Sequence, residues 1–246
     1  MPQVYFSTRL QSVNYRTLIR WWEQNSFGRH LYIGHAAYKI YWDSDKSWYN
    51  KSELPEQLRY NRQFVNIKGS AYFRASSFMR NRGNFRDSLR HNFYKTRALI
   101  PPMPWKDDIP ARKPDSVKIK QQADGTLVTW KIPKEALDGE MPARYVLYRV
   151  PKNSPVSAVE EPGNILEILP ATEQSYFDNS PRHFQYDYLV TSLDRLHNES
   201  APALPVKEPL LVDGKYTLEE IALFTSHFQQ GVNNYFSKYR DKEKVN

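Results

Sequence analysis

The sequence predicts an α/β region, then a β region, then a C-terminal helix, and three observations predict this order. Strand-like and helix-like segments alternate about every thirty residues in the first hundred positions, as they do in parallel βαβ units. A proline-rich stretch at residues 100–114 then ends the alternation. Only short strand patterns follow it, until an amphipathic pattern returns near the C-terminus.

Three strand-helix units form the predicted α/β region. The strands are predicted at residues 4–7, 31–34 and 67–73, and the helices at 13–25, 55–64 and 84–94. Gly28 ends the first helix, and Pro55 suits the first turn of the second. In the third helix Phe85, Leu89 and Phe93 recur one turn apart. A long loop, residues 41–53, is rich in Trp, Tyr, Ser, Asp and Lys.

Parallel units of this spacing are typical of a (β/α)₈ barrel, which has about 250 residues. Three units would be its last part, and the chain starts directly in a strand pattern. A small open α/β sheet, complete in itself, is the alternative, although about a hundred residues with three strands bury little core. We therefore expect residues 1–105 to be the C-terminal part of a (β/α)₈ barrel.

Two stretches of this region resemble a known family. The first, residues 28–40, reads Gly-Arg-His-Leu-Tyr-Ile-Gly-His-Ala-Ala-Tyr-Lys-Ile. The second runs from Pro-Glu-Gln-Leu-Arg-Tyr-Asn-Arg at 55–62 to Ile-Lys-Gly-Ser-Ala-Tyr-Phe at 67–73. Both resemble the last barrel strands of the glycosyl hydrolase-like 10 family, and residues 98–105 resemble its barrel exit. The resemblance covers residues 2–105. It implies a bacterial cell-envelope or periplasmic protein whose relatives act on the glycan strands of peptidoglycan.

After a linker at residues 106–114, residues 115–206 are predicted to form a β-sandwich. Residues 117–121 and 127–132 suit a hairpin, because Asp124-Gly125 fits the positive φ angles of a tight turn. Residues 144–150 and 186–193 alternate between two faces, and Trp130 is of a buried type. Residues 186–202 resemble the final strands of a fibronectin type III domain, with Tyr188 as a corner tyrosine bonded to nearby backbone. Such a domain follows the barrel in many relatives of the family.

Residues 207–246 are predicted to be a linker and an amphipathic helix. Thr217 and Glu220 have the spacing of a capping box. Apolar residues then recur near one stripe, at Ile221, Phe224, Phe228, Tyr235 and Tyr239. The stripe either docks on the chain's own domains or contacts a partner.

Composition excludes several classes of protein. The chain has 246 residues, 40% of them hydrophobic, and no cysteine. Disulfides, thiolate nucleophiles and cysteine-based zinc sites are therefore excluded. No window approaches the ~18 consecutive apolar residues of a transmembrane helix, and no signal peptide pattern stands at Met1. No phosphate-binding loop or metal-ligand spacing occurs, so we expect no cofactor and no metal.

Positive charge is concentrated in the α/β region. Up to Trp105 the sequence has 17 Lys and Arg against 6 Asp and Glu, a net charge of +11, whereas the remainder carries −3. A basic surface attracts anionic ligands, and peptidoglycan strands with their lactyl carboxylates are one such partner. Arg and aromatic residues also interleave at residues 74–94, as in nucleic-acid binders. Because Phe85, Leu89 and Phe93 fit the core face of a helix, we expect no nucleic-acid partner.

In barrels of this kind, sites are built where strands end. This rule selects Tyr5 and Ser7, then His35, Tyr38 and Lys39, then Arg74 and Ser76. With two loop tryptophans, the candidate substrate-binding residues are Tyr5, His35, Tyr38, Lys39, Trp42, Trp48 and Arg74. Aromatic faces suit sugar rings, Lys39 and Arg74 suit a carboxylate, and His35 suits a sugar hydroxyl. In the alternative interpretation, Tyr5 and Tyr38 fill the barrel and His35 is a satisfied polar group.

Catalytic residues remain unassigned. Glycoside hydrolysis needs two carboxyl groups about 5 to 9.5 Å apart, and no Asp or Glu stands at the three strand ends. Asp43 and Asp45 suit a solvated turn. We therefore expect an inactive C-terminal fragment of a glycoside hydrolase. A non-catalytic adaptor and a nucleic-acid binder are the alternatives. Exposed sheet edges favour a homo-oligomer.

Overall fold

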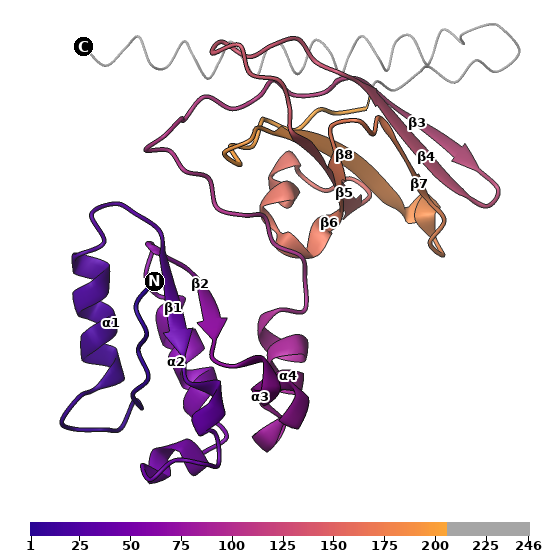
Figure 1. The fold of residues 1–246 in the computed structure, drawn as a ribbon. Coiled ribbons are helices and arrows are strands. Elements are labelled where there is room, and N and C mark those ends of the chain that lie inside the picture. Colours follow the sequence, from indigo (N-terminus) through magenta and orange to yellow (C-terminus); the bar gives the residue numbers. More distant parts are fainter. Residues whose placement is uncertain (206–246) are drawn as a thin grey trace, which may run out of the picture. The chain divides into compact units, whose positions relative to one another are not determined.

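Two parallel strands with helices around them form the first part of the chain (Figure 1). The computed structural model describes residues 1–205, so the predicted helix within residues 207–246 lies outside the described residues. A crossover through α2 joins the two strands, as a parallel pair requires. The elements are α1 (Tyr15–Gln24), β1 (Leu31–His35), α2 (Glu53–Asn61), β2 (Ile67–Tyr72), α3 (Ala75–Arg80) and α4 (Phe85–Ser88), and a π-helical turn (Leu89–Phe93) follows.

The strand predicted at residues 4–7 is wrong as a regular strand. Gln3 forms a single parallel bridge with Gly34. The Val4 N–H donates to the Gly34 oxygen at 3.0 Å, and the Gly34 N–H donates to the Pro2 oxygen at 2.8 Å. The pairing stops there because the chain leaves the sheet after Val4. Within residues 1–105 the described sheet thus has two strands and one bridge, and the (β/α)₈ barrel stays a prediction.

The predicted helices are confirmed with shifted ends. Helix α1 begins at Tyr15 because the Asn14 side chain caps it, accepting a bond from the Arg16 N–H at 2.9 Å. The third predicted helix is divided between α4 and the π-helical turn, with Phe85 and Leu89 buried one turn apart. Helix α3 was not predicted, because its six residues carry no apolar repeat. None of the helices within residues 1–205 has the length and apolar character needed to cross a bilayer.

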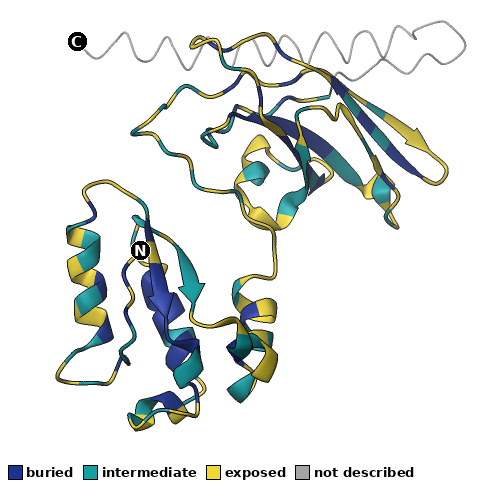
Figure 2. Ribbon diagram, viewed as in Figure 1, coloured by how far each residue is buried: buried dark blue, intermediate teal, exposed yellow. Residues whose placement is uncertain are grey.

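Burial differs sharply between the two strands. Figure 2 shows β1 and most of α2 in dark blue and β2 in teal. Ile33 of β1 packs in one cluster with Tyr15 and Ile19 of α1 and Tyr60 of α2. Leu58 of α2 packs with Trp48 in a second cluster. Strand β2 has a neighbour on one edge only within the described residues. The predicted association through such edges stays a prediction.

The second part of the described chain contains two antiparallel three-stranded sheets that share one hydrophobic core. Trp130, Tyr145, Leu147 and Tyr188 lie in this core, which confirms a β-sandwich. Strands β6 and β7 were not predicted, and the fibronectin type III assignment stays a prediction. One sheet has the order β3 (Asp115–Gln122), β4 (Gly125–Lys131), β7 (Ser175–Asp178), and the other has β6 (Ile165–Pro170), β5 (Arg144–Pro151), β8 (Tyr186–Leu193).

Strands β5 and β8 alternate between two faces as predicted, with Tyr145 and Leu147 in one cluster and Val146 and Tyr148 in another, and both faces are buried. Residues 145–148 and 188–193 are buried without interruption. The outward face of this sheet is covered by Leu99, Ala158 and Val159, which pack against the cluster that contains Val146 and Leu189. A sheet covered on both faces has continuous apolar strands.

Tyr188 anchors the corner of the sandwich, but mainly through a carboxylate. Its hydroxyl donates to Asp178 Oδ2 at 2.7 Å and lies 3.4 Å from the His183 carbonyl oxygen. Burial alone would raise the pKa of Asp178, yet hydrogen bonds from Ser180, Tyr188 and Arg149 lower it to about 2. The expected bond to nearby backbone is therefore the weaker of the two contacts.

The β3–β4 hairpin is confirmed, but the reason given for its glycine is wrong. Gln122 pairs with Gly125, so Ala123 and Asp124 form the turn. The φ angle of Gly125 lies outside the left-handed region. A Cβ atom at this position would lie 2.5 Å from Phe177 Cζ and 2.7 Å from the Asp178 backbone oxygen. Close approach of β7, not a positive φ angle, requires the glycine.

Replacing Gly125 with alanine should lower the free energy of unfolding by about 1–3 kcal/mol, the usual cost of overpacking. Urea unfolding of the full chain measures this change. Gly163→Ala is the control, because its Cβ atom would only reach ordinary contact with Thr96 at 3.9 Å. Equal stability of the Gly125→Ala and Gly163→Ala proteins would contradict the close-packing argument.

Candidate functional site

His35, the last residue of β1, lies in a buried polar network. Its Nδ1 lies 3.0 Å from Gln57 Oε1, and its Nε2 lies 3.0 Å from Ser70 Oγ. The ring stacks between those of Tyr15 and Tyr72, at centroid distances of 6.2 and 5.3 Å. The side chain is fully buried. This burial does not agree with the expectation that His35 contacts a sugar, and it supports the satisfied polar group instead.

The partners of Gln57 determine which nitrogen of His35 carries the proton. Gln57 Nε2 donates to the Phe6 carbonyl oxygen at 3.1 Å and to Glu53 Oε1 at 2.9 Å, and both of these groups only accept. Gln57 Oε1 therefore faces His35 and accepts from Nδ1–H. The Ser70 hydroxyl then donates to Nε2. Burial lowers the pKa of His35 to about 4, although the bond to Gln57 opposes this shift.

Glu53 is the buried carboxylate that anchors the network, and sequence reasoning missed it. It is 1% exposed. Its Oε1 accepts from the Thr8 N–H at 2.6 Å, and its Oε2 accepts from the Thr8 hydroxyl at 2.8 Å. A signal was present in the sequence, since Glu53 and Gln57 are four residues apart and next to the apolar pair Leu54 and Leu58. Both carboxylate oxygens are thus occupied by structural bonds.

A small cavity of about 60 Å³ lies where β1 and β2 end. Three of the predicted residues, Tyr38, Trp42 and Arg74, line it, and sequence reasoning missed Arg80 and Arg82. The guanidinium carbon of Arg82 lies 4.7 Å from the centre of the Trp42 ring, a cation–π distance. We call this cavity the arginine cleft; its lining residues are Ala37, Tyr38, Trp42, Arg74, Ser77, Arg80, Arg82 and Phe85.

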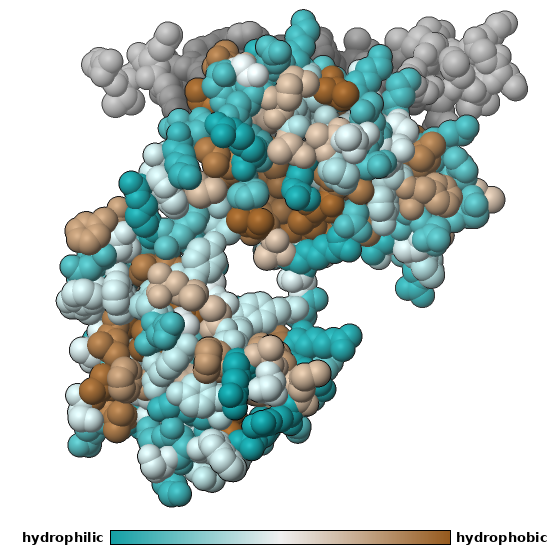
Figure 3. Space-filling model, viewed as in Figure 1, coloured by the Kyte–Doolittle hydropathy of each residue, from teal (hydrophilic) through white to brown (hydrophobic). Residues whose placement is uncertain are grey.

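The arginine cleft carries uncompensated positive charge. Nearby cations are paired: Lys39 Nζ lies 3.1 Å from Asp43 Oδ2, and Arg86 Nε lies 3.1 Å from Asp87 Oδ1. In the described part of the chain, by contrast, no ion pair involves the three arginines of the cleft, and no Asp or Glu lines it. Hydrophilic and hydrophobic side chains interleave over α3 and α4 on the face shown in Figure 3. Such a surface suits an anionic ligand with an apolar face.

An unusual turn presents Arg82 to the cleft. Asn81, Gly83 and Asn84 all have positive φ angles, of 44°, 61° and 56°. A Cβ atom on Gly83 would lie 2.6 Å from the Tyr41 ring, so only glycine allows the turn to reach the loop that carries Trp42. The Asn81 side chain holds the turn, because it donates to Asp87 Oδ2 at 2.7 Å and accepts from the Arg86 N–H at 2.9 Å.

The other predicted residues lie outside the cleft. Trp48 is 1% exposed and packs in the core, which does not agree with the expectation that it stacks on a sugar. Tyr5 is half-buried, with its ring edge-on to Tyr38 at 6.1 Å. Lys39 forms the ion pair with Asp43 described above. Ser7 is buried, where its hydroxyl oxygen accepts from the Leu10 N–H at 3.1 Å. Ser76 is half-buried in α3.

The predicted turn around Asp43 and Asp45 is confirmed. Asp43 Oδ1 accepts from the Asp45 N–H and Asp45 Oδ1 from the Ser47 N–H, both at 2.9 Å. Partial burial would raise the pKa of Asp45, but hydrogen bonds from Ser7 and Ser47 and the charge of Lys39 lower it overall. These carboxylates therefore organise the loop and are not tuned as an acid pair.

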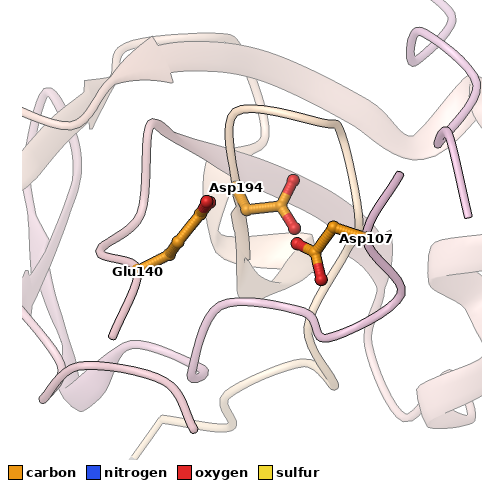
Figure 4. A group of neighbouring side chains, drawn as sticks. All are labelled: Asp107, Glu140 and Asp194. Atoms are coloured by element: carbon orange, nitrogen blue, oxygen red, sulfur yellow. The ribbon is translucent and has the colours of Figure 1, made fainter. Parts of the chain in front are cut away.

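Three further carboxylates meet in the sandwich region, and sequence reasoning missed them. Asp107, Glu140 and Asp194 have oxygen atoms within 4.8 Å of one another, and Asp107 and Asp194 face each other (Figure 4). Asp194 accepts from the N–H groups of Leu196 and Asn198, and Glu140 pairs with Arg195 at 2.5 Å. Asp107 Oδ1 accepts from the Ile109 N–H at 3.1 Å, whereas its buried Oδ2 has no hydrogen-bond partner among the described residues. We interpret the cluster as a structural part of this region.

The pH dependence of folding should report the burial of His35. The folded pKa is about 4 and the ordinary value is 6.5, so between these values the unfolded chain binds a proton that the folded chain excludes. The stability conferred by neutral His35 is complete above pH 6.5. It is lost as the pH falls towards 4, by about 3 kcal/mol. Urea unfolding at pH 7 and pH 4.5 measures the loss.

Between pH 7 and pH 4.5, His35→Gln should lose less free energy of unfolding than the unmodified chain, whatever its stability at pH 7. His30, whose pKa is also lowered by burial, remains in both proteins and cancels in the comparison. The exposed His91 provides the control, since His91→Gln should keep the full loss. An unchanged loss in His35→Gln would show that other groups cause it.

Comparison with known proteins identifies a curated relative, glycosyl hydrolase YngK of Bacillus subtilis (strain 168). The two sequences are 34% identical over 202 residues, which is 81% of this chain and 39% of YngK. The chain therefore spans well under half the length of that relative. No family model matches the sequence.

Two solved structures overlap parts of the chain. A human structure described as a fourth FNIII domain is 19% identical to this chain in sequence. The match covers 49% of this chain and 93% of that domain, with a TM-score of 0.28. Pectate lyase Pel3 from Pectobacterium carotovorum is 16% identical, with 39% of this chain and 28% of the lyase covered and a TM-score of 0.27. Both TM-scores lie below 0.5. The similarity to YngK supports a glycosyl hydrolase-like family for this chain.

Proposed function

We propose that this chain is the C-terminal, glycan-binding part of a glycosyl hydrolase-like protein directed at bacterial cell-wall glycan. In this proposal residues 1–105 complete a (β/α)₈ barrel and residues 115–206 form a fibronectin type III-like domain, after a linker at 106–114. The protein works in the cell envelope or periplasm of a bacterium, on peptidoglycan strands. Support comes from the similarity to YngK and from the resemblance of residues 28–40 and 55–73 to the glycosyl hydrolase-like 10 family.

The arginine cleft is the observation that carries the proposal. Trp42 is 71% exposed, so its ring offers a flat apolar face to a sugar. Arg74 beside it is exposed and has no acidic partner among residues 1–205. Its guanidinium group suits the carboxylate of muramic acid, which it can bind through two parallel hydrogen bonds. Tyr38 adds a hydroxyl group at the same place.

We infer that this part of the protein binds glycan without hydrolysing it, because the carboxylates of the α/β region are already bonded. Hydrolysis needs one protonated and one ionised carboxyl group on either side of the scissile bond. Asp43 is paired with Lys39, and both oxygens of Glu53 accept bonds from Thr8. No carboxylate pair thus faces the cleft in the part of the chain that the structure describes. The catalytic acids would belong to other parts of the barrel.

A second candidate is a non-catalytic adaptor module of the envelope that binds carbohydrate or protein. The observation in its favour is a groove of about 440 Å³ along the free edge of β2. Ile67, Gly69 and Ser70 of β2 line it, opposite Phe93 and Tyr94. An unpaired strand edge next to apolar side chains can accept an extended peptide.

Trp42→Ala and Arg74→Ala should weaken retention of the chain on purified peptidoglycan strands. Trp42→Ala removes the flat apolar face on which a sugar ring would lie. The loss of a charged hydrogen bond costs about 1.5–3 kcal/mol. Sedimentation with glycan strands measures the bound fraction.

Matched controls for this experiment lie elsewhere in the α/β region. Trp21, on α1, is 54% exposed and packs edge-on against Trp22, and Arg90 is exposed outside the cleft. Trp21→Ala and Arg90→Ala should bind like the unmodified chain. Equal binding by all four variants would rule out the arginine cleft as the glycan site.

The chain by itself should release no reducing ends from peptidoglycan strands, because no carboxylate pair faces the cleft. A reducing-sugar assay over several hours checks this expectation. If product forms, the Asp43→Asn and Glu53→Gln variants show whether either carboxylate is responsible. Activity that one of them abolishes would overturn the non-catalytic assignment.

A further inference from the structure

The arginine cleft holds more positive charge than a carboxylated sugar requires. A carboxylate is one negative charge, and a single guanidinium group satisfies both of its oxygens. Three guanidinium groups line the cleft, those of Arg74, Arg80 and Arg82. No acidic side chain among residues 1–205 neutralises them, although Lys39 and Arg86 nearby each have one. The excess of charge indicates a ligand with more than one negative charge or with more acceptor oxygens.

The size of the cavity points to a small acidic group. Its volume is about 60 Å³, and one water position needs about 10–15 Å³. The cavity therefore has room for about four to six water positions, enough for a compact acidic group such as a phosphate. The exposed ring of Trp42, which forms part of the lining, is the surface on which a sugar can lie.

We propose that the arginine cleft binds a phosphate ester carried by a saccharide, with the phosphate among the three arginines and the sugar on Trp42. A phosphate ester has a charge of about −1.5 to −2 at pH 7 and three strong acceptor oxygens. These oxygens match the three guanidinium groups in number. The inference rests on the proposed glycan-binding function and names the class of saccharide that the site prefers.

A phosphate in a nucleic acid is the competing ligand, and the aromatic residues of the cleft disfavour it. Single-stranded nucleic acid stacks successive bases on successive aromatic side chains. Phe85 is 4% exposed, and Tyr38 is half-buried. Trp42 is the one largely exposed aromatic ring that lines the cleft within the described residues. One platform suits a single sugar better than a run of bases.

Isothermal titration calorimetry of the full 246-residue chain tests the proposal with four matched probes. They are N-acetylglucosamine, N-acetylmuramic acid, N-acetylglucosamine 6-phosphate and inorganic phosphate, all at about 0.15 M salt, where long-range attraction is screened. The sugar phosphate should bind at least tenfold more tightly than any other probe. Equal or tighter binding of N-acetylmuramic acid would overturn the proposal, as would equal binding of inorganic phosphate.

Substitutions locate the phosphate. Arg80→Ala and Arg82→Ala should each weaken binding of the sugar phosphate about tenfold and change that of N-acetylmuramic acid less than twofold, because Arg74 remains. Arg82→Lys keeps the charge but loses the planar guanidinium group. Its affinity for the sugar phosphate should therefore lie between those of the unmodified chain and Arg82→Ala. Trp42→Ala should reduce the affinity for the sugar phosphate to that for inorganic phosphate. Arg90→Ala is the control and should change nothing.

Two outcomes separate this inference from the proposed function. Retention of peptidoglycan strands without a preference for the sugar phosphate, or with unchanged affinity in Arg80→Ala and Arg82→Ala, overturns the inference and leaves glycan binding in place. Failure to bind any of the saccharides or strands overturns both. A single-stranded oligonucleotide that binds more tightly than the sugar phosphate would replace the inference with nucleic-acid binding.

Discussion

The α/β region depends on the buried hydrogen bonds that join Glu53 and Gln57 of α2 to two other segments. A buried carboxylate is costly unless its oxygens are bonded, and Glu53 meets this requirement through the backbone and hydroxyl of Thr8. Gln57 extends the chain of bonds to Phe6 and to His35 at the end of β1. The bonds therefore hold the first residues of the chain, α2 and β1 in one arrangement. The loop that carries Tyr38 and Trp42 starts from this fixed point.

The arginine cleft results from how charge is distributed around that loop. Acidic side chains are few in this region, and they are used where they shape the backbone: Asp43 pairs with Lys39, and Asp87 holds Asn81. The turn that Asn81 stabilises brings Arg82 over the ring of Trp42. The arginines that line the cavity are thereby left for a ligand. In the proposed function, the carboxyl groups that hydrolysis needs belong to other parts of the barrel.

The similarity to YngK extends beyond the α/β region. It covers 202 residues, more than either the first 105 residues or the sandwich strands at 115–193 provide, so it includes parts of both. In the sandwich, polar contacts such as that of Tyr188 with Asp178 stabilise the fold. The cleft that Trp42 and Arg74 line lies in the α/β region. The proposed binding function is accordingly placed in the α/β region.

Local periodicity alone determined α1, β1, β2, the β3–β4 hairpin and the strands at β5 and β8. The positions of Tyr38 and Arg74 also followed from the sequence, because the ends of neighbouring parallel strands meet at one edge. Only the tertiary structure decided that His35 is buried, since its hydrogen-bond partner Gln57 is 22 residues away. The same holds for Glu53, whose carboxylate accepts hydrogen bonds from Thr8, 45 residues away. The placement of Arg80 and Arg82 around the cavity that Trp42 lines, and the contact of Phe177 with Gly125, were decided in the same way. Burial and charge pairing depend on residues that are distant in sequence, and no local pattern records them.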